Sequence, residues 1–163
     1  MPSTLRLYKS EKLCSQTAID LLFGRREPKP CAATGGAAAG CSQRPGGSLA
    51  FPLRAVWRVN PGRQRGAGVQ FLISIPKKRL RHAVDRVTMR RRVREAYRLN
   101  RHLLENLPDG VLIDMAFVYV APTLQSYAAV ESAVCRLLRR MVKDLKDSKD
   151  SKVIKEGDDG LPQ

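Results

Sequence analysis

Residues 83–100 decide the fold of this chain and read Ala83-Val84-Asp85-Arg86-Val87-Thr88-Met89-Arg90-Arg91-Arg92-Val93-Arg94-Glu95-Ala96-Tyr97-Arg98-Leu99-Asn100. In this stretch and in the residues that follow it, up to 107, apolar residues recur at three- and four-residue spacing, which is typical of an amphipathic helix. The stripe consists of Met89, Val93, Ala96, Tyr97, Leu104 and Leu107. Pro108-Asp109-Gly110 ends the pattern, so the spacing predicts a helix over 83–107 that packs on a sheet, with Tyr97 in the core.

Three apolar segments supply the sheet. Residues 49–60 alternate loosely and end at the turn signal Asn60-Pro61-Gly62. Residues 68–75 form a second strand that Pro76 stops, and residues 112–121 form a third that Pro122 closes. Pro and Gly clusters of this kind commonly bound strands. We expect residues 63–67 to make a basic hairpin loop between the first two strands.

Two further helices are predicted near the ends of the chain. Ser15 is a plausible N-cap and Gly24 a plausible stop for a short helix whose Ile19, Leu22 and Phe23 share one face. A last helix begins near Ser126, with an apolar stripe of Tyr127, Val130, Val134, Leu137, Leu138, Met141 and Leu145. The order helix, two or three strands, helix, strand, helix predicts one two-layer domain of helices and sheet.

The chain has 163 residues, the length of one domain with tails. We predict a single domain over residues 1–146, interrupted at about 28–48 by a flexible insertion in which ten of the eighteen residues 31–48 are Ala or Gly. Residues 147–163 are charged, contain Gly and are predicted to be a disordered tail.

Composition narrows the class of protein. Lys and Arg total 30 against 15 acids, a net charge of +15, which favours a polyanionic partner: nucleic acid ahead of an anionic membrane. No apolar run reaches the roughly 18 residues of a membrane span, and no secretory signal is visible. We therefore expect a cytoplasmic protein that does not bind a membrane.

Cysteine and histidine offer little for metal binding or catalysis. Cys14, Cys31, Cys41 and Cys135 lack the close spacing of a zinc site and are expected to be reduced thiols. His82 and His102 lie among arginines, so we expect them at a helix surface or facing RNA. Asp85, Glu95, Asp109 and Asp114 are too scattered to predict the two-metal site of a protein nuclease.

The basic residues are concentrated. Residues 77–101 contain eleven Lys or Arg and two acids, and five arginines of the predicted helix fall within an arc of roughly 100°. Like charges one turn apart destabilise a helix by about 0.2–0.5 kcal/mol per pair. A bound polyanion would offset this repulsion, so the charge pattern favours a surface that binds one. Arg can also grip phosphate with two donors and stack on bases. The alternative is a solvated charged face, although such faces usually mix both signs.

The stretch Lys77–Leu99 closely resembles the signature of the bacterial ribonuclease P protein component family. The matching features are the Lys77-Lys78 pair after a strand, the Ala83-Val84 step, the arginine core and Arg94-Glu95-Ala96-Tyr97-Arg98. The resemblance extends over roughly residues 5–24 and 50–142. The family's Arg-Asn-Arg is Arg86-Val87-Thr88 here, so this chain departs from the pattern at Val87 and Thr88.

The resemblance implies an α+β two-layer sandwich: a small sheet packed with about three helices, ribosomal protein S5 domain 2-like, with a left-handed crossover. It also implies the protein subunit of ribonuclease P, which binds the catalytic RNA and the 5′ leader of precursor tRNA. The RNA, with Mg²⁺ bound mainly by RNA, is then the catalyst that removes the leader, so the holoenzyme is an endoribonuclease. No catalytic residue and no metal site are expected in the protein.

The resemblance and the charge pattern together predict the binding residues. We expect phosphate contacts, mainly with the catalytic RNA, from Lys77, Lys78, Arg79, Arg81, Arg86, Arg90, Arg91, Arg94 and Arg98. The leader is expected to cross the open face of the sheet near the first helix, where Phe23, Phe51 and Trp57 are candidates to stack on bases. For each of these aromatic side chains, general burial trends favour the core at least as much as the leader site.

Other functions remain open at this point. A sequence-specific DNA-binding regulator is the main alternative, because a basic helix can enter the major groove. Base readout there usually draws on Asn or Gln as well as Arg, and the arginine face offers Asn100 alone. A protein-only nuclease and a structural RNA binder of ribosomal type are further alternatives.

Overall fold

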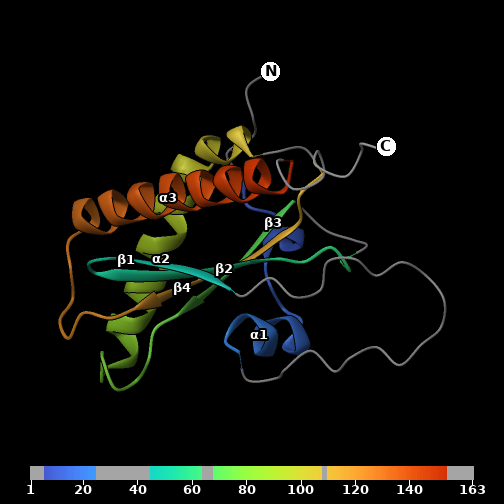
Figure 1. The fold of residues 1–163 in the computed structure, drawn as a ribbon. Helices are drawn as coiled ribbons and strands as arrows, with labels where there is room; N and C mark the ends of the chain where they lie inside the picture. Colours follow the sequence, from blue (N-terminus) through green and yellow to red (C-terminus); the bar gives the residue numbers. More distant parts are fainter. Residues whose placement is uncertain (1–5, 25–44, 64–67, 108–109, 154–163) are drawn as a thin grey trace, which may run out of the picture.

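The computed structural model describes residues 6–24, 45–63, 68–107 and 110–153. The helices are α1 (Gln16–Leu22), α2 (Ala83–Asn100) and α3 (Tyr127–Val153), with short 3-10 helices at Lys9–Glu11 and Arg101–Asn106. The strands are β1 (Gly46–Ala50), β2 (Leu53–Val59), β3 (Val69–Ser74) and β4 (Ile113–Tyr119). Figure 1 shows their arrangement.

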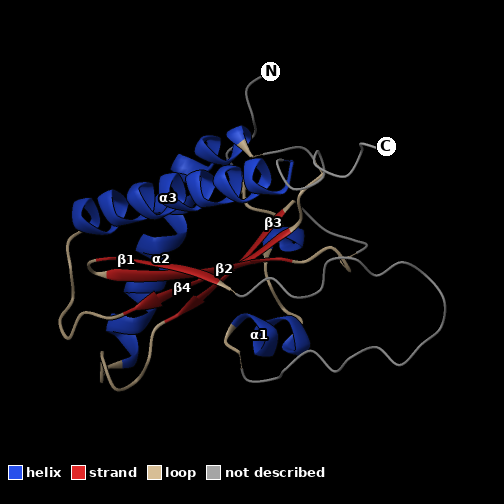
Figure 2. Ribbon diagram, in the orientation of Figure 1, coloured by secondary structure: helices blue, strands red, loops and turns tan. Residues whose placement is uncertain are grey.

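The four strands form one mixed sheet in the order β1-β2-β4-β3. β1 with β2 and β2 with β4 are antiparallel, whereas β3 and β4 are parallel neighbours connected through α2. α2 and α3 lie on one side of the sheet and α1 on the other (Figures 1 and 2). The predicted α+β two-layer architecture is thus confirmed, while the left-handed crossover remains a prediction.

Each face of the sheet has its own core. Leu53, Ala55 and Trp57 alternate along β2 on the face that packs against α2 and α3. On the other face, Val56 of β2 and Ala116 of β4 pack against α1. Because successive side chains of a strand point to opposite faces, this division also places Arg54 on the α1 side. The sheet therefore has one fully covered face and one that α1 covers in part.

The predicted helix stripes are confirmed. Met89, Val93, Ala96 and Tyr97 of α2 are buried, and Tyr97 packs between Phe71 and Phe117, with ring centroids 4.1 and 6.2 Å away. α2 itself ends at Asn100, and Leu104 and Leu107, which follow in or after the 3-10 helix, are partly buried. The α3 stripe is likewise buried or partly buried.

The predicted ends of α1 are also confirmed. The backbone N–H of Ala18 donates to Ser15 Oγ at 3.4 Å, so Ser15 is the N-cap. Gly24 follows the helix with a φ of 66°, a left-handed conformation that costs glycine little. These two residues fix where α1 begins and where the chain leaves it.

Several boundaries predicted from the sequence were wrong. The segment 49–60 is not one strand, because the chain turns at Phe51-Pro52 and returns as an antiparallel pair, β1 and β2. Residues 46–48, assigned to the flexible insertion, therefore belong to β1. Gly46 pairs with Trp57, and a Cβ added to Gly46 would lie 2.5 Å from Trp57 Nε1, so the absence of a side chain allows this pairing. Of the rest of the insertion, residues 28–44 lie outside the described residues, and Pro45 has no regular secondary structure.

Two other expectations need correction. Residues 63–67 do not connect a hairpin, because β4 lies between β2 and β3 in the sheet; residues 64–67 themselves lie outside the described residues. The predicted disordered tail overlaps α3, whose helical backbone continues to Val153. Residues 154–163 lie outside the described part of the chain.

We predict that Gly46→Ala destabilises the protein by about 1–3 kcal/mol, because overpacking would push Trp57 out of its position. Trp57 is the single tryptophan of the chain, so its fluorescence emission should shift as the stability measured by urea unfolding falls. Gly47→Ala is the matched control, since its Cβ would meet only Ala55 O, at 3.4 Å. Equal stability of the two variants would contradict the close packing of Gly46 on Trp57.

Candidate functional site

A basic turn connects β3 to α2. The turn is anchored by the buried side chains of Ile75 and Leu80 and by the backbone, where the N–H groups of Arg79 and Leu80 donate to Pro76 O at 2.9 and 3.3 Å. Between and after these anchors, four cationic side chains are exposed: Lys77, Lys78, Arg79 and Arg81. The anchors fix the backbone while the charges remain in solvent.

Arg86 stabilises this turn from within α2. Its Nη1 donates to the carbonyl oxygens of Leu80 at 3.0 Å and Arg81 at 2.6 Å, and its side chain is half-buried. Arg92 acts similarly at another junction, because its Nη1 donates to the carbonyl oxygen of Gln125 just before α3. Both guanidinium groups therefore have structural roles, and the sequence pattern alone did not separate them from their neighbours.

Three arginines of α2 differ from these. Arg90, Arg91 and Arg94 are exposed, and no ion pair to them is found among the described residues. We call these three residues, together with the four cations of the turn, the basic surface. Its positive charge is not neutralised by carboxylates of the described chain, so it is available to an anionic partner.

Arg98, one turn beyond Arg94, is paired. Its Nη2 and Nε donate to Glu95 at 2.5 and 2.9 Å, and this hydrogen bonding lowers the pKa of the Glu95 carboxyl. Arg101 contacts the buried Glu11 at 3.2 Å and so ties the end of α2 to the N-terminal segment. The predicted arc of arginines is therefore not uniform. Arg90 and Arg94 form no ion pair with a described residue, whereas Arg98 pairs with Glu95.

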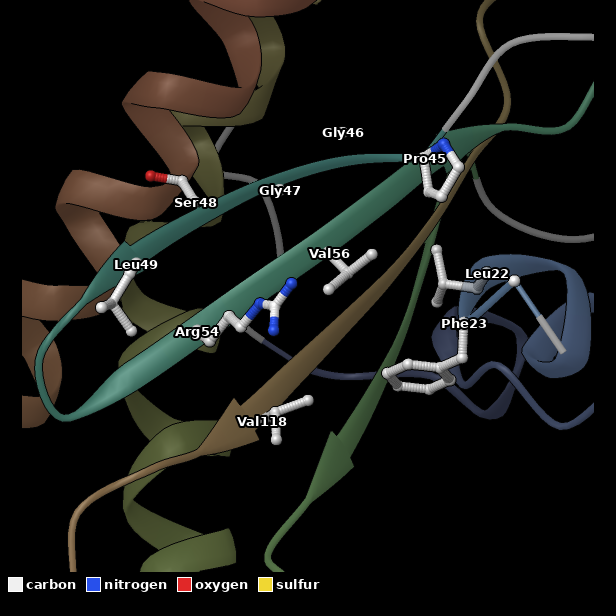
Figure 3. A pocket seen from close by; sticks show the side chains of 11 residues that line it. Leu22, Phe23, Pro45, Gly46, Gly47, Ser48, Leu49, Arg54, Val56 and Val118 are labelled. Atoms are coloured by element: carbon white, nitrogen blue, oxygen red, sulfur yellow. The ribbon is translucent and has the colours of Figure 1, made fainter.

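A hollow of about 650 Å³ lies on the other side of the sheet, next to α1. Figure 3 shows the Phe23 ring leaving the end of α1 toward the strands, with Arg54 of β2 and Val118 of β4 nearby. Arg54 and Val118 are direct partners in the sheet, which places them side by side on this face. We call it the α1 hollow; it is lined by Leu22, Phe23, Gly24, Pro45, Gly46, Gly47, Ser48, Leu49, Arg54, Val56 and Val118.

The aromatic candidates have different locations. Phe23 is 39% exposed and lines the α1 hollow. Phe51 is 58% exposed at the turn between β1 and β2 and is not among the residues that line it. Trp57 is 3% exposed and belongs to the core under α2 and α3, so of its two predicted locations the core is the one observed, and Trp57 does not line the α1 hollow. The alternation of Arg54 and Arg58 with apolar neighbours is the signal that predicts the opposite face for Trp57.

The sequence reasoning missed two features of the open face. Arg54 was not among the predicted binding residues, although it lines the α1 hollow. Asp114 is buried and accepts hydrogen bonds from Arg63 at 2.6 Å and Asn60 at 2.7 Å, while Arg63 also donates to Gly68 O at 2.7 Å. This network fixes both ends of the loop between β2 and β3, and only the three-dimensional structure brings its members together.

The remaining candidates for chemistry are few. Cys14 is exposed and Cys135 half-buried, both as free thiols, while Cys31 and Cys41 lie outside the described residues. Within the described ranges, no three His, Cys, Asp or Glu side chains gather as metal ligands would. None of the described helices is long and apolar enough to cross a membrane. Burial raises the pKa of the Tyr97 phenol, consistent with its predicted core position.

A small α+β domain with an exposed basic surface on a helix is typical of proteins that bind nucleic acid. The family described as Ribonuclease P matches residues 50–145. Two relatives named ribonuclease P protein component, from two strains of Porphyromonas gingivalis, are each 33% identical over 142 residues, which cover 86% of this chain and 89% of the relative. The chain belongs to the ribonuclease P protein component family, as the signature in residues 77–99 predicted.

The two kinds of arginine in α2 should respond differently to replacement. We expect Arg86→Ala and Arg92→Ala to lower the free energy of unfolding by about 1.5–3 kcal/mol, because each removes charged hydrogen bonds to backbone carbonyls. Arg90→Ala and Arg94→Ala should stay within about 0.5 kcal/mol of the parent protein, as exposed substitutions usually do. Urea unfolding measures all four, and equal losses in both pairs would contradict this division.

Proposed function

We propose that this chain is the protein subunit of ribonuclease P and that it binds the catalytic RNA and the 5′ leader of precursor tRNA. The observation that carries the proposal is the exposed Arg90, Arg91 and Arg94 surface, without carboxylate partners among the described residues, in a member of this family. The holoenzyme removes the leader to produce the mature 5′ end of tRNA.

The charge on α2 supports binding of a folded RNA through its phosphates. Guanidinium groups match phosphate oxygens with two parallel donors, and clustered positive charge gains free energy when bound counterions are released from RNA. The basic surface joins side chains of a helix and of the preceding turn, so it presents a shaped array rather than a single row. Such an array suits recognition of RNA shape, which depends on backbone positions.

The α1 hollow is the proposed site for the leader. Phe23 offers a ring on which a base can stack, and Arg54 offers a donor for phosphate, a combination that is typical of single-strand binding. The hollow lies on the face of the sheet opposite α2, so the leader and the catalytic RNA would contact different sides of the protein. The protein then holds both RNAs without competition between them.

The catalyst in this proposal is the RNA, with Mg²⁺ bound mainly by RNA. Four acids of the described structure form ion pairs within the protein: Asp114 with Arg63, Glu11 with Arg101, Glu95 with Arg98, and Asp144 with Arg140. The role left for the chain is to position RNA and to reduce the repulsion between RNA phosphates. This role requires exposed cations rather than an acidic metal site.

Among the described residues, no contact favours a sequence-specific DNA regulator. Asn100 is the amide side chain available for base readout on the arginine face, and its Nδ2 donates to Ala96 O at 2.9 Å and to Glu131 Oε1 at 3.2 Å. Its donors are therefore engaged within the protein. A competition gel shift between RNase P RNA and duplex DNA separates the two functions, and tighter binding to DNA would contradict our proposal.

Reconstitution tests the function directly. The full-length protein should stimulate precursor-tRNA cleavage by RNase P RNA at low Mg²⁺, because its cations replace part of the counterion charge that the RNA needs. The RNA alone at the same Mg²⁺ concentration is the control. Absence of stimulation would refute the proposed subunit role.

Leader binding should depend on the α1 hollow. In the same holoenzyme, Phe23→Ala should weaken binding of precursor tRNA about five-fold or more, since a stacked base contributes about 1–3 kcal/mol. Binding of mature tRNA, which lacks the leader, should be unchanged. An equal loss for both tRNAs, or no loss for either, would remove Phe23 from the leader site.

The salt dependence of binding tests the basic surface. Each lost phosphate contact lowers the slope of log K against log salt by about 0.7–0.9, so Arg90→Ala and Arg94→Ala should flatten the slope for RNase P RNA. Arg140→Ala on α3 is the control, because it changes the net charge by the same amount. Arg140 pairs with Asp144 at 2.9 Å and lies outside the basic surface. The salt dependence of RNA binding by this variant should therefore have the same slope as that of the parent protein. Equal slopes in all variants would exclude the proposed contacts.

A further inference from the structure

A second hollow, distinct from the α1 hollow, lies between the N-terminal segment, the edge strand β3 and α2. Its volume is about 480 Å³, within the range of pockets that hold small ligands. It shares no lining residue with the α1 hollow. We call it the edge cleft; it is lined by Leu7, Tyr8, Lys12, Leu13, Cys14, Phe71, Leu72, Ile73, Arg90 and Arg94.

The N-terminal wall of the edge cleft is fixed to the domain. Leu13 N donates to Phe71 O at 3.1 Å, and Lys12 forms a parallel bridge with Phe71. Glu11 accepts from Tyr8 N at 3.2 Å and from Arg101 Nη1 at 3.2 Å, which ties this segment to the end of α2. The cleft is therefore formed before any partner binds, and its ordering cost on binding is small.

The lining of the cleft combines positive charge with apolar surface. Arg90 and Arg94 are exposed members of the basic surface, and Lys12 adds a third cation. None of the described residues that line the cleft carries a carboxylate. Leu13 and Phe71 are buried apolar residues of the lining, and the Tyr8 side chain is 48% exposed. An aromatic ring beside two guanidinium groups suits a ligand with both a flat ring and a phosphate.

The edge of β3 adds hydrogen-bonding groups to the cleft. β3 has β4 on one side only, and the backbone groups of alternate residues along a strand point to opposite sides. Phe71 O points away from β4, because it accepts from Leu13. The N–H and C=O of Ile73 must point the same way, and no hydrogen bond joins them to a described residue outside the β3–β4 ladder. A donor and an acceptor thus face the same cleft.

We propose that the edge cleft binds one unpaired nucleotide of the catalytic RNA, with its base against Tyr8 and the Ile73 backbone and its phosphate on Arg90 and Arg94. This inference rests on the proposed function and deepens it. The catalytic RNA is favoured over the leader because Arg90 and Arg94 of the basic surface line the cleft, whereas no residue of the basic surface lines the α1 hollow, the proposed leader site. The nucleotide must be unpaired, since a base inside a duplex cannot reach a protein ring.

Substitution of Tyr8 tests the stacking contact in the full-length protein. Tyr8→Ala should weaken binding to RNase P RNA, without precursor tRNA, about five-fold or more, whereas Tyr8→Phe should retain the affinity because it keeps the ring. Leu124→Ala is the control, because Leu124 is a similarly exposed large apolar residue that lines neither the edge cleft nor the α1 hollow. Its affinity for RNase P RNA should equal that of the parent protein.

Cys14 permits a direct map of the contact, because it is exposed and lines the cleft. In a variant with Cys31, Cys41 and Cys135 replaced by Ser, a photoactivatable aryl azide on Cys14 should crosslink to one short unpaired segment of RNase P RNA. The crosslink should persist when precursor tRNA is added. It should fall when Tyr8→Ala is introduced, at RNA concentrations that keep the protein bound.

The results separate failure of the cleft from failure of the function. If the protein neither binds RNase P RNA nor stimulates cleavage, both proposals fall. If it stimulates cleavage but Tyr8→Ala binds RNase P RNA as tightly as the parent protein, the cleft proposal alone is overturned. Crosslinks only to the leader, or only to paired nucleotides, overturn it as well. Thermal unfolding of Tyr8→Ala confirms that any loss of affinity comes from a folded protein.

Discussion

α2 must remain a helix although several of its arginines repel one another, and the rest of the structure depends on how this is achieved. Repulsion costs about 0.2–0.5 kcal/mol per like-charge pair on a helix. Burial of a large apolar side chain contributes about 1.5–3 kcal/mol, and Met89, Val93 and Tyr97 are all buried against the sheet. Packing therefore exceeds repulsion, and the helix can hold exposed cations in a fixed array.

The position of α2 between two strands determines what its charges can reach. The basic turn connects β3 to α2, and the chain then returns as β4, which lies parallel to β3. α2 therefore lies across one face of the sheet (Figure 2). α3 covers the rest of that face, which leaves the other face to α1 alone. Since α1 has seven residues, it covers that face only in part, and a hollow remains beside it. One small sheet thus offers two binding sides.

The arginines of this chain look alike in the sequence but have different roles in the structure. Arg86 and Arg92 bind backbone carbonyls, Arg63 binds the buried Asp114, and Arg101 binds Glu11. The contacts of Arg92, Arg63 and Arg101 join segments that are distant along the chain, so no local pattern indicates them. Arg90 and Arg94 stand out as candidates for RNA binding only once the arginines with contacts inside the protein have been identified. A binding surface in a protein this basic is therefore a tertiary property.

The sequence by itself determined the helical stripes, the caps of α1, the strand segments and the family, because these depend on spacing and residue type within short windows. It did not determine that Phe51-Pro52 divides one apolar segment into two strands, or that β4 lies between β2 and β3. It also did not bring Tyr8 near Arg94 in one cleft. Strand order and clefts arise from contacts between residues far apart in the chain, and only the packed structure decides which of these contacts form together.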